Sequence, residues 1–462
     1  MSGLAVHATD IPGLIVIDLE VRGDNRGWFK ENWQRAKLTA LGLPDFGPVQ
    51  NNVSFNASAG VTRGVHAEPW DKLVSVATGR IFGAWVDLRP GDSFGAVVTR
   101  ELGPETAVFV PRGVGNAFQT LEPATAYSYL VNDHWSPAAK DSYTFVNVAD
   151  ETLAIHWPIP LERCELSEAD KNHPRLADVT PMRPRATLIV GAGGQLGRAL
   201  RRVLPDAVAA DRAALDLADP ASVAAFDFAP YGVVVNAAAH TKVDAAETPE
   251  GRREAWAANV SGVAALVRAA AEQRFTLVHV SSDYVFDGTV ELHREDEPFS
   301  PLGVYGQTKA AGDALVATLQ RHYLVRTSWV IGDGHNFVRT MASLADRGIE
   351  PSVVDDQYGR LTFTTELAAG IVHLLDSGAA YGTYNLSSDG PVQTWADIAR
   401  DVFAARGRDR AVVRGVSAED YAAGKHLAPR PRHSALALDK LSATGFRPRS
   451  GPELLQEYLS QL

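Results

Sequence analysis

The sequence predicts two domains, an all-β first half followed by an α/β second half. At roughly 100–200 residues per domain, 462 residues allow two to four domains. Up to about residue 160, short runs of β-forming residues are broken by Gly, Pro, Asn and Asp, which is typical of a sandwich or barrel. From Ala186 onward, apolar strand-like runs alternate with Ala-rich helical stretches, which indicates a parallel sheet covered by helices.

The expected strands and domain boundaries follow from these runs. The strands of the first half are Leu14–Leu19, Leu73–Thr78, Ile81–Leu88, Thr106–Val110 and Ala126–Val131. Those of the second half are Thr187–Val190, Val233–Asn236, Leu277–Ser281 and Tyr323–Thr327. Between the halves, Lys171–Arg185 holds three prolines, which favour an exposed linker because proline lacks an N–H for helix or ladder hydrogen bonds. We expect domains over 1–175 and 187–462, joined by a linker over 176–186.

Composition restricts the function classes. With 45% hydrophobic and 21% charged residues, the chain has an ordinary globular composition, which excludes wholesale disorder. The 44 Lys and Arg residues against 55 Asp and Glu residues give a net charge of −11. This charge argues against a protein that mainly coats nucleic acid or an anionic membrane, while local anion sites stay possible.

A cytoplasmic protein is the expected setting. Cys164 is the sole cysteine, so no intramolecular disulfide or cysteine-rich zinc site is expected, which fits a reducing compartment. The first ten residues lack the basic flank and apolar core of a secretory signal. No uninterrupted apolar stretch reaches about 18 residues, so no membrane-spanning segment is expected.

A glycine-rich turn follows the first strand of the second half. Gly191, Gly194 and Gly197 precede a helical stretch, where glycines let the backbone approach a pyrophosphate at a helix N-terminus. The spacing differs from the usual dinucleotide fingerprint and also suits a purely structural turn. About twenty residues on, Asp211 suits ribose hydroxyls and Arg212 suits a 2′-phosphate, so the choice between NADH and NADPH stays open.

Tyr305 and Lys309 form a Tyr-x-x-x-Lys pair. Four residues apart, they lie on one face of a helix, so the ammonium is expected to lower the pKa of the phenol and to hold the nicotinamide ribose. The phenol can then give a proton to the alkoxide that forms when a carbonyl carbon receives hydride. Alone, such a pair is usually a surface feature. After a glycine-turn βαβ unit, with Ser281, Ser282 and Asp283 closing the intervening strand, it indicates a reductase.

Further motifs of the second half appear in the order Gly191–Gly197, Asn236–Asp244, Ser281–Gly288, Tyr305–Lys309, Arg326–Trp329, Asn336-Phe337, Asp356-Gln357 and Arg430-Pro431. Over roughly 187–460, this series resembles the dTDP-4-dehydrorhamnose reductases, which are extended short-chain dehydrogenase/reductases. The resemblance implies an NAD(P)-binding Rossmann domain with a small substrate-binding part. Leu361 departs from the family, which has Pro at that place, and we expect the change to affect only a loop.

The resemblance also implies residue roles. The catalytic set would be Ser282, Tyr305 and Lys309. NADPH or NADH would contact Tyr305 and Lys309 together with Gly191, Gly194, Gln195, Leu196, Gly197, Asp211, Arg212, Asp216, Leu217, Ala237, Ala238 and Ala239. The sugar nucleotide would contact Ser282, Asp283, Trp329 and Arg430. Capping of strand ends is the alternative for the residues at 216–217 and 237–239, and assistance by Mg²⁺, as in some relatives, is left open.

Polar residues cluster in the first half, in Asp24–Glu31, Gln50–Ser54 and Val61–His66, with Lys72 close behind. Arginines near a histidine and a lysine, on short strands of an all-β fold, suit an anionic ligand in the mouth of a barrel. His66 alone is equally a candidate for a satisfied core histidine. In order and spacing, the cluster resembles the dTDP-4-dehydrorhamnose 3,5-epimerases, cupin-type jelly rolls, over roughly 5–175.

This second resemblance implies an epimerase site. The nucleotide and its phosphates would be held by Arg26, Glu31, Gln50, Asn52 and Arg63. His66, oriented by Asp170, would remove the protons next to the C4 ketone, while Lys72 stabilises the enolate oxygen and Tyr129 returns a proton from the opposite face. The His-x-His pair of metal-binding cupins is absent, so no metal is predicted.

Several positions depart from the epimerase pattern. Asn116 replaces a substrate-contacting His, and Trp135 stands where a second aromatic residue, often Tyr, is expected. Lys140 lies near the place of an expected Glu, and the segment between His66 and Lys72 is shorter than usual. Because the implied base, enolate stabiliser and acid are all present, we expect these changes to affect binding rather than chemistry.

Together the halves predict a bifunctional enzyme of dTDP-L-rhamnose synthesis that acts on dTDP-4-dehydro-6-deoxy sugars. One alternative is a reductase whose first half is a non-catalytic nucleotide-binding or dimerisation module. A second alternative is a regulatory protein, since the reductase fold also resembles the NADP-binding regulatory subunit of methionine adenosyltransferase. Related epimerases commonly dimerise through their jelly rolls, which implies a homodimer.

Overall fold

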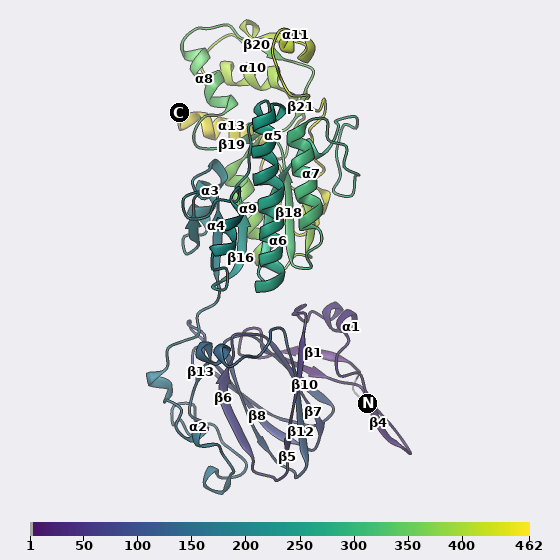
Figure 1. The fold of residues 1–462 in the computed structure, drawn as a ribbon, viewed down its shortest axis with the longest axis vertical. Helices are drawn as coiled ribbons and strands as arrows, with labels where there is room; N and C mark the ends of the chain where they lie inside the picture. Colours follow the sequence, from purple (N-terminus) through teal and green to yellow (C-terminus); the bar gives the residue numbers. More distant parts are fainter. Residues whose placement is uncertain (1–2) are drawn as a thin grey trace. The chain divides into compact units, whose positions relative to one another are not determined.

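The computed structural model describes residues 3–462 and divides into two compact units, Met1–Pro184 and Arg185–Leu462 (Figure 1). The first unit consists mainly of antiparallel strands, and the second alternates parallel strands with helices. The fold classes predicted for the two halves are therefore confirmed. Within residues 3–462, no helix is long and apolar enough to cross a membrane.

The first unit is a sandwich of two antiparallel sheets. The six-stranded sheet has the order β1 (Ala5–Ala8), β2 (Ile15–Asp18), β10 (Thr106–Val110), β7 (Lys72–Thr78), β12 (Thr125–Val131) and β5 (Gln50–Asn56). The five-stranded sheet has the order β13 (Thr144–Phe145), β6 (Thr62–Ala67), β11 (Val114–Thr120), β8 (Ile81–Asp87) and β9 (Val97–Leu102). Val74 and Val108 of the first sheet share one buried core with Trp85 and Phe118 of the second, as the facing sheets of a jelly roll require.

A hairpin stands apart from both sheets. Its strands are β3 (Val21–Asp24) and β4 (Gly27–Lys30), which pair only with each other and are followed by the short helix α1 (Arg35–Ala40). Strand β5, which pairs with β12 alone, is an edge of the six-stranded sheet. Phe29 of the hairpin and Val53 and Phe55 of β5 are 66%, 65% and 64% exposed. The hairpin and this edge strand thus carry large apolar side chains in contact with solvent.

The segment expected to be an exposed linker packs onto the first unit instead. After α2 (Glu168–Lys171), a single 3₁₀ turn covers Leu176–Asp178, and the backbone N–H of Met182 donates to the carbonyl of Leu88 at 2.8 Å. The side chains of Leu176 and Met182 are buried in the core beside Leu88. Proline keeps this segment out of the sheets, but burial of the two apolar side chains still fixes its path.

The second unit has a six-stranded, fully parallel sheet. Its order is β15 (Val208–Ala210), β14 (Ala186–Val190), β16 (Tyr231–Asn236), β17 (Thr276–Ser282), β18 (His322–Thr327) and β23 (Gly382–Asn385). Helices α3 (Gln195–Val203) and α9 (Thr364–Asp376) share a core with one set of strand side chains. The other set packs against α4 (Pro220–Ala225), α6 (Gly262–Gln273) and α7 (Val304–Val316). Figure 1 shows α6 and α7 side by side, together with α5 (Pro249–Trp256).

A smaller subdomain has a core of its own, drawn from separate stretches of the chain. Its helices are α8 (Phe337–Asp346), α10 (Trp395–Ala405) and α13 (Gly451–Ser460). Paired short strands accompany them, namely β19 (Val330–Ile331) with β22 (Thr362–Phe363), β20 (Ser352–Val354) with β25 (Arg414–Val416), and β21 (Tyr358–Gly359) with β24 (Gln393–Thr394). The remaining short helices are α11 (Ala418–Ala422) and α12 (Asp439–Ala443).

Candidate active sites

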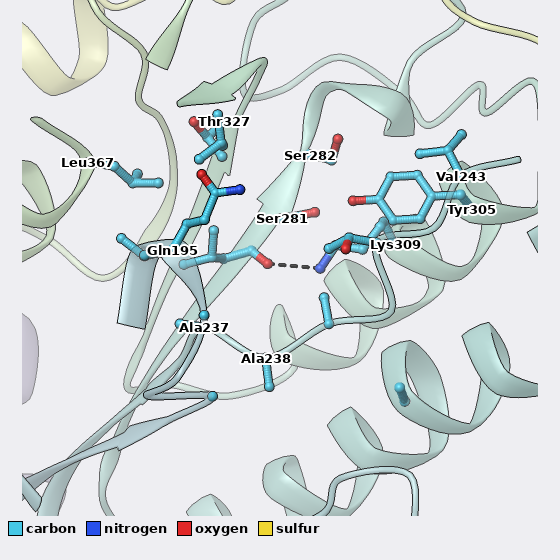
Figure 2. Close-up of a pocket in the computed structure, with 18 of the residues that line it drawn as sticks. Gln195, Ala237, Ala238, Val243, Ser281, Ser282, Tyr305, Lys309, Thr327 and Leu367 are labelled. Atoms are coloured by element: carbon cyan, nitrogen blue, oxygen red, sulfur yellow. Dashed lines mark hydrogen bonds between the residues drawn. The ribbon is translucent and has the colours of Figure 1, made fainter. Parts of the chain in front are cut away.

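A pocket of about 740 Å³ opens where the parallel strands of the second unit end (Figure 2). In a doubly wound sheet this edge is where ligands bind, because loops from several strands and the N-termini of helices meet there. Most residues predicted for the cofactor line it, namely Gly191, Gly194, Gln195, Leu196, Asp211, Arg212, Asp216, Leu217, Ala237, Ala238, Ala239, Tyr305 and Lys309. The pocket also contains Ser282, Asp283 and Trp329.

The glycine turn has the shape that a dinucleotide needs. Gly191 has φ +77°, and a Cβ atom placed on it would lie 2.7 Å from the backbone nitrogen of Ala238, so only glycine fits. Gly197 does not line the pocket; a Cβ there would lie 2.3 Å from the carbonyl of Gly191, so this glycine lets α3 pack against the turn. Gly194 caps the N-terminus of α3, leaving the first N–H groups of the helix for an anion.

The predicted catalytic residues of the second unit come together. Figure 2 shows the hydroxyl of Tyr305 beside Ser281 and Ser282, while the ammonium of Lys309 donates to the carbonyl of Val280 at 2.8 Å. The hydroxyl of Ser282 donates to Asp283 at 2.9 Å. β17 supplies the serines and α7 supplies Tyr305 and Lys309, so the site joins a strand end to a helix face.

Burial governs the titration of this site. It lowers the pKa of Lys309 to about 8 and raises that of Asp283 to about 6. The pKa of Tyr305 is also raised, first by burial and then by the charge of Asp283. This direction differs from the expectation that Lys309 lowers the pKa of the phenol, because removal from water outweighs the neighbouring ammonium.

Two buried polar clusters lie beside Lys309 and were not anticipated from the sequence. Asp313, one turn further along α7, accepts from the guanidinium of Arg326 at 3.0 Å, and both side chains are buried. Asn259 accepts from the backbone N–H of His240 and donates to Thr308 next to Lys309. A lone Asp or Asn in an Ala-rich helix gives no sequence signal, because its partners come from other elements.

A second cavity of about 830 Å³ adjoins the first and shares Tyr284, Trp329, Phe337 and Trp395 with it. Arg430 lines only this second cavity, where Asp244 holds its guanidinium through two hydrogen bonds of 2.9 and 3.0 Å. The rings of Trp329 and Trp395 stack with centroids 3.8 Å apart. The sequence indicated Trp329, Phe337 and Arg430 but missed Trp395, which carries no local motif.

The first unit contains a pocket of about 410 Å³ between its two sheets. His66 on β6 and Asn116 on β11 come from the five-stranded sheet, whereas Lys72 on β7 and Tyr129 on β12 come from the six-stranded sheet. Asp170, Arg63 and the departing residues Trp135 and Lys140 also line it. The residues proposed as base and acid therefore come from opposite walls of one cavity.

His66 is held by a buried carboxylate. Its Nε2 lies 2.7 Å from Oδ1 of Asp170. Burial opposes ionisation of Asp170, but the hydrogen bond and charge of His66 and a hydrogen bond with Ser167 outweigh it and lower its pKa. His173, which the sequence did not indicate, faces the same oxygen at 3.8 Å. The three side chains at 66, 170 and 173 place possible metal-ligand atoms within 4.8 Å of one another. The sequence did not indicate this cluster, because it has no His-x-His pair.

Asn116 has a defined role in the pocket wall. Its side-chain oxygen accepts from Trp85 Nε1 and from the hydroxyl of Tyr127, each at 3.0 Å. Among the described residues, no hydrogen bond engages its amide nitrogen. The substitution of Asn for His thus presents an N–H donor to the cavity.

Four predicted substrate ligands do not line this pocket. Arg26 is exposed on the β3–β4 hairpin and pairs with Asp24, and Glu31, just after it, pairs with Lys37. Gln50 and Asn52 lie on edge strand β5, where the amide of Gln50 donates to Asn52 at 2.8 Å. The hairpin belongs to neither sheet, so it does not bring Arg26 to the cavity of its own chain.

The fold and site define the second unit as a nicotinamide-dependent reductase of the short-chain type, and the first as a jelly roll with a His–Asp dyad. The chain belongs to the family described as RmlD substrate binding domain, whose model matches residues 185–462. Residues 8–178 match the family of dTDP-4-dehydrorhamnose 3,5-epimerases. Both resemblances found in the sequence are confirmed, and one chain joins an epimerase-family domain to a reductase-family domain.

Individual relatives match one half each. Over 181 residues the chain is 53% identical to the protein RmlC homolog of Streptococcus pyogenes, covering 38% of this chain and 91% of that protein. It is 36% identical over 286 residues to the dTDP-4-dehydrorhamnose reductase of Aggregatibacter actinomycetemcomitans, covering 56% and 94%. A solved dTDP-4-dehydrorhamnose reductase from Bacillus anthracis, in complex with NADP, is 32% identical, with a TM-score of 0.55 over 60% of this chain and 99% of that chain.

Proposed function

We propose that the chain catalyses the last two steps of dTDP-L-rhamnose synthesis. The first unit epimerises dTDP-4-dehydro-6-deoxy-D-glucose at C3 and C5, and the second reduces the C4 ketone with NADPH or NADH. The observation that supports the proposal is that one chain gathers two sets of side chains suited to these reactions in two pockets. They are the His66–Asp170 dyad with Lys72 and Tyr129, and Ser282 with Tyr305 and Lys309. Such an enzyme acts on nucleotide sugars in the cytoplasm.

The proposed base and acid lie on opposite walls of the cavity, as epimerisation requires. His66 removes the proton at the carbon next to the ketone, and the electron pair of the broken C–H bond moves onto the C4 oxygen as an enolate. The ammonium of Lys72 stabilises that oxygen, and Tyr129, from the other sheet, delivers a proton to the opposite face of the carbon. Asp170 fixes the tautomer of His66 and stabilises the imidazolium that forms.

In the second unit, the glycine turn fits a dinucleotide, with the pyrophosphate at the N-terminus of α3. When bound, the nicotinamide supplies hydride to C4. Tyr305 donates its phenolic proton to the C4 oxygen, and the hydroxyl of Ser282 turns from Asp283 to donate a hydrogen bond to that oxygen. The ammonium of Lys309 is placed to hold a ribose hydroxyl, while the rings of Trp329 and Trp395 shield the sugar from water. We propose no metal-dependent step in the reduction.

The two steps reinforce each other. Epimerisation by proton removal and return is freely reversible, so it yields little of a less stable ketone. Reduction of that ketone is effectively irreversible and draws the epimer off. Both domains recognise the same nucleotide sugar, which gives a reason for their fusion.

Deuterium exchange tests the epimerase half separately. The full chain, incubated in D₂O with dTDP-4-dehydro-6-deoxy-D-glucose and no nicotinamide cofactor, is expected to incorporate deuterium at C3 and C5, measured by NMR. Absence of exchange at both carbons would favour the alternative in which the first unit only binds nucleotide. The epimerase-family match and the intact dyad favour exchange.

Arg212 provides a test of cofactor preference. It lines the cofactor pocket next to Asp211, where a 2′-phosphate would lie. We expect NADPH to be preferred and Arg212→Ala to raise the KM for NADPH by about 10-fold or more, since a charge-assisted hydrogen bond contributes roughly 1.5–3 kcal/mol. The KM for NADH should stay nearly constant. Arg201→Ala, an exposed arginine on α3 outside the pocket, is the matched control. Equal effects on both cofactors would contradict this role.

We propose that the protein is a homodimer formed through the hairpin and the edge strand of the first unit. The exposed Phe29, Val53 and Phe55 supply an apolar face there. The hairpin carries Arg26 and strand β5 carries Gln50, and neither residue lines the pocket of its own chain. Contact with a second copy gives these side chains access to the pocket of the partner.

Light scattering after gel filtration checks the dimer. The full chain is expected at twice its 49.6 kDa mass, and Phe55→Glu is expected at one chain mass because a charge would be buried at the interface. The control is Val203→Glu, which places the same charge on an exposed valine of the second unit. A Phe55→Glu protein that stays dimeric would contradict the assignment of this face.

A further inference from the structure

Glu68 is a carboxylate inside the epimerase pocket that the catalytic set leaves unused. It is the first residue after β6 and lies two positions beyond His66 in the sequence. It belongs to the segment between His66 and Lys72, which is shorter than usual for the family. One carboxylate oxygen lies 3.0 Å from the ammonium of Lys72, and the other accepts from Trp70 Nε1 at 2.5 Å. The side chains of Lys72 and Glu68 are only 4% and 11% exposed. This ion pair is therefore largely removed from water.

The charge of Glu68 acts on the wall that carries the proposed acid. Burial raises the pKa of Tyr129, and the carboxylate of Glu68 raises it further, while Arg63 opposes both. The pKa of Tyr143, another lining residue, is raised by burial and by the same carboxylate. A fixed negative charge therefore faces the hydroxyl groups of this cavity.

Lys140 stands near the place where the family pattern has a Glu, so that carboxylate is missing from its expected position. Lys140 itself lines the pocket, together with the cations Arg63 and Lys72 and the carboxylate of Glu68. Glu68 and Asp170 are the carboxylates among the lining residues, and Asp170 is engaged by His66. Among the described residues that line the pocket, Glu68 is the carboxylate that pairs with Lys72.

We propose that Glu68 is a positioning residue for epimerisation, which holds the Lys72 ammonium where the enolate oxygen forms. The proposal rests on the function proposed for this pocket. After Tyr129 has given up its proton, a phenolate beside the carboxylate is unfavourable, so Tyr129 regains a proton before the next exchange. The charge of Glu68 thus favours the return of a proton to Tyr129.

The test compares Glu68→Gln with Glu68→Asp in the full chain, measuring deuterium exchange at C3 and C5 against pH. For Glu68→Gln we expect kcat to fall by about 10- to 100-fold with little change in KM, since the ammonium that stabilises the enolate is no longer held in place while binding is kept. Loss of the charge lowers the pKa of Tyr129, so the alkaline limb of the pH profile should move to lower pH. Glu68→Asp keeps the charge, so its alkaline limb should stay near that of the parent while kcat falls.

Controls separate this proposal from the function on which it rests. Glu162→Gln removes an exposed carboxylate outside the pocket and should leave rate and profile unchanged. If the parent chain shows no exchange, the epimerase assignment fails. If the parent is active but Glu68→Gln keeps its kcat and alkaline limb, the role of Glu68 is overturned. If Glu68→Gln fails to fold, Glu68→Asp provides the test. The shorter side chain withdraws the carboxylate from the 3.0 Å contact with Lys72, so a parental kcat in this variant would overturn the proposal.

Discussion

Replacing Tyr305 by Phe is expected to lower kcat for reduction by about 10²- to 10⁴-fold, the range typical of general acid catalysis. The phenol is the group placed to protonate the C4 oxygen as hydride arrives, and Phe keeps the edge-to-face contact with Tyr284 at 5.4 Å. Packing is thereby retained while the proton donor is lost. The measurement is oxidation of NADPH with the 3,5-epimerised ketone as substrate.

The control for this variant is Tyr323→Phe, which removes the hydroxyl of a buried tyrosine outside the pocket. That hydroxyl donates to the carbonyl of Ala379, so the change costs a comparable hydrogen bond without touching the site. Deuterium exchange by Tyr305→Phe should equal that of the parent, because the other unit performs it. A Tyr305→Phe protein that retains more than about a tenth of the parental kcat would contradict the proton-donor role.

Replacing His66 by Gln is expected to lower deuterium exchange at C3 and C5 by about 10²- to 10⁴-fold. An amide cannot accept a proton from carbon, although it still reaches Asp170 with a hydrogen-bond donor. Asp170→Asn should cause a smaller loss, because the base remains but its tautomer and its imidazolium form lose their partner. NMR in D₂O without nicotinamide cofactor measures both.

His156→Gln is the matched control, since His156 is exposed in the same unit and does not line the pocket. The His66→Gln protein should still reduce the epimerised ketone at the parental rate. Loss of both activities would mean that the substitution acts on folding rather than on the base. Parental exchange would remove His66 from the mechanism and leave it as a core histidine.

The gathering of the predicted cofactor residues around one pocket could be foreseen from the sequence, because these residues follow strand ends. Parallel strands finish at the same edge of the sheet, so Gly191, Asp211, Ala237 and Ser282 converge once the strands are identified. Tyr305 and Lys309 are four residues apart in one helix, which fixes their common face. Local geometry and topology together were sufficient to predict that these residues share a pocket.

Other features depend on contacts between distant segments. Glu68 and His173 were missed because their interactions, with Lys72 and Asp170 respectively, form only in the folded structure. The pKa of Tyr305 was expected to fall, yet burial, which spacing does not reveal, raises it. Arg26 matched a family ligand by position, but the hairpin carries it away from the pocket of its own chain.

The boundary between the units shows the same limitation. Prolines in 171–185 correctly indicate a segment without sheet or long helix, but they do not report on packing. Leu176 and Met182 bury their side chains against the first unit, a tertiary effect that composition does not reveal. The compact first unit therefore extends to Pro184.

The most direct test supplies the full chain with dTDP-4-dehydro-6-deoxy-D-glucose and NADPH, and identifies the product sugar by NMR. The account predicts one NADPH consumed per sugar and dTDP-L-rhamnose as product, with His66→Gln blocking the conversion and Tyr305→Phe stopping it at the ketone. Reduction to a sugar unaltered at C3 and C5, or altered at only one of them, would contradict the claim that one chain carries out both steps.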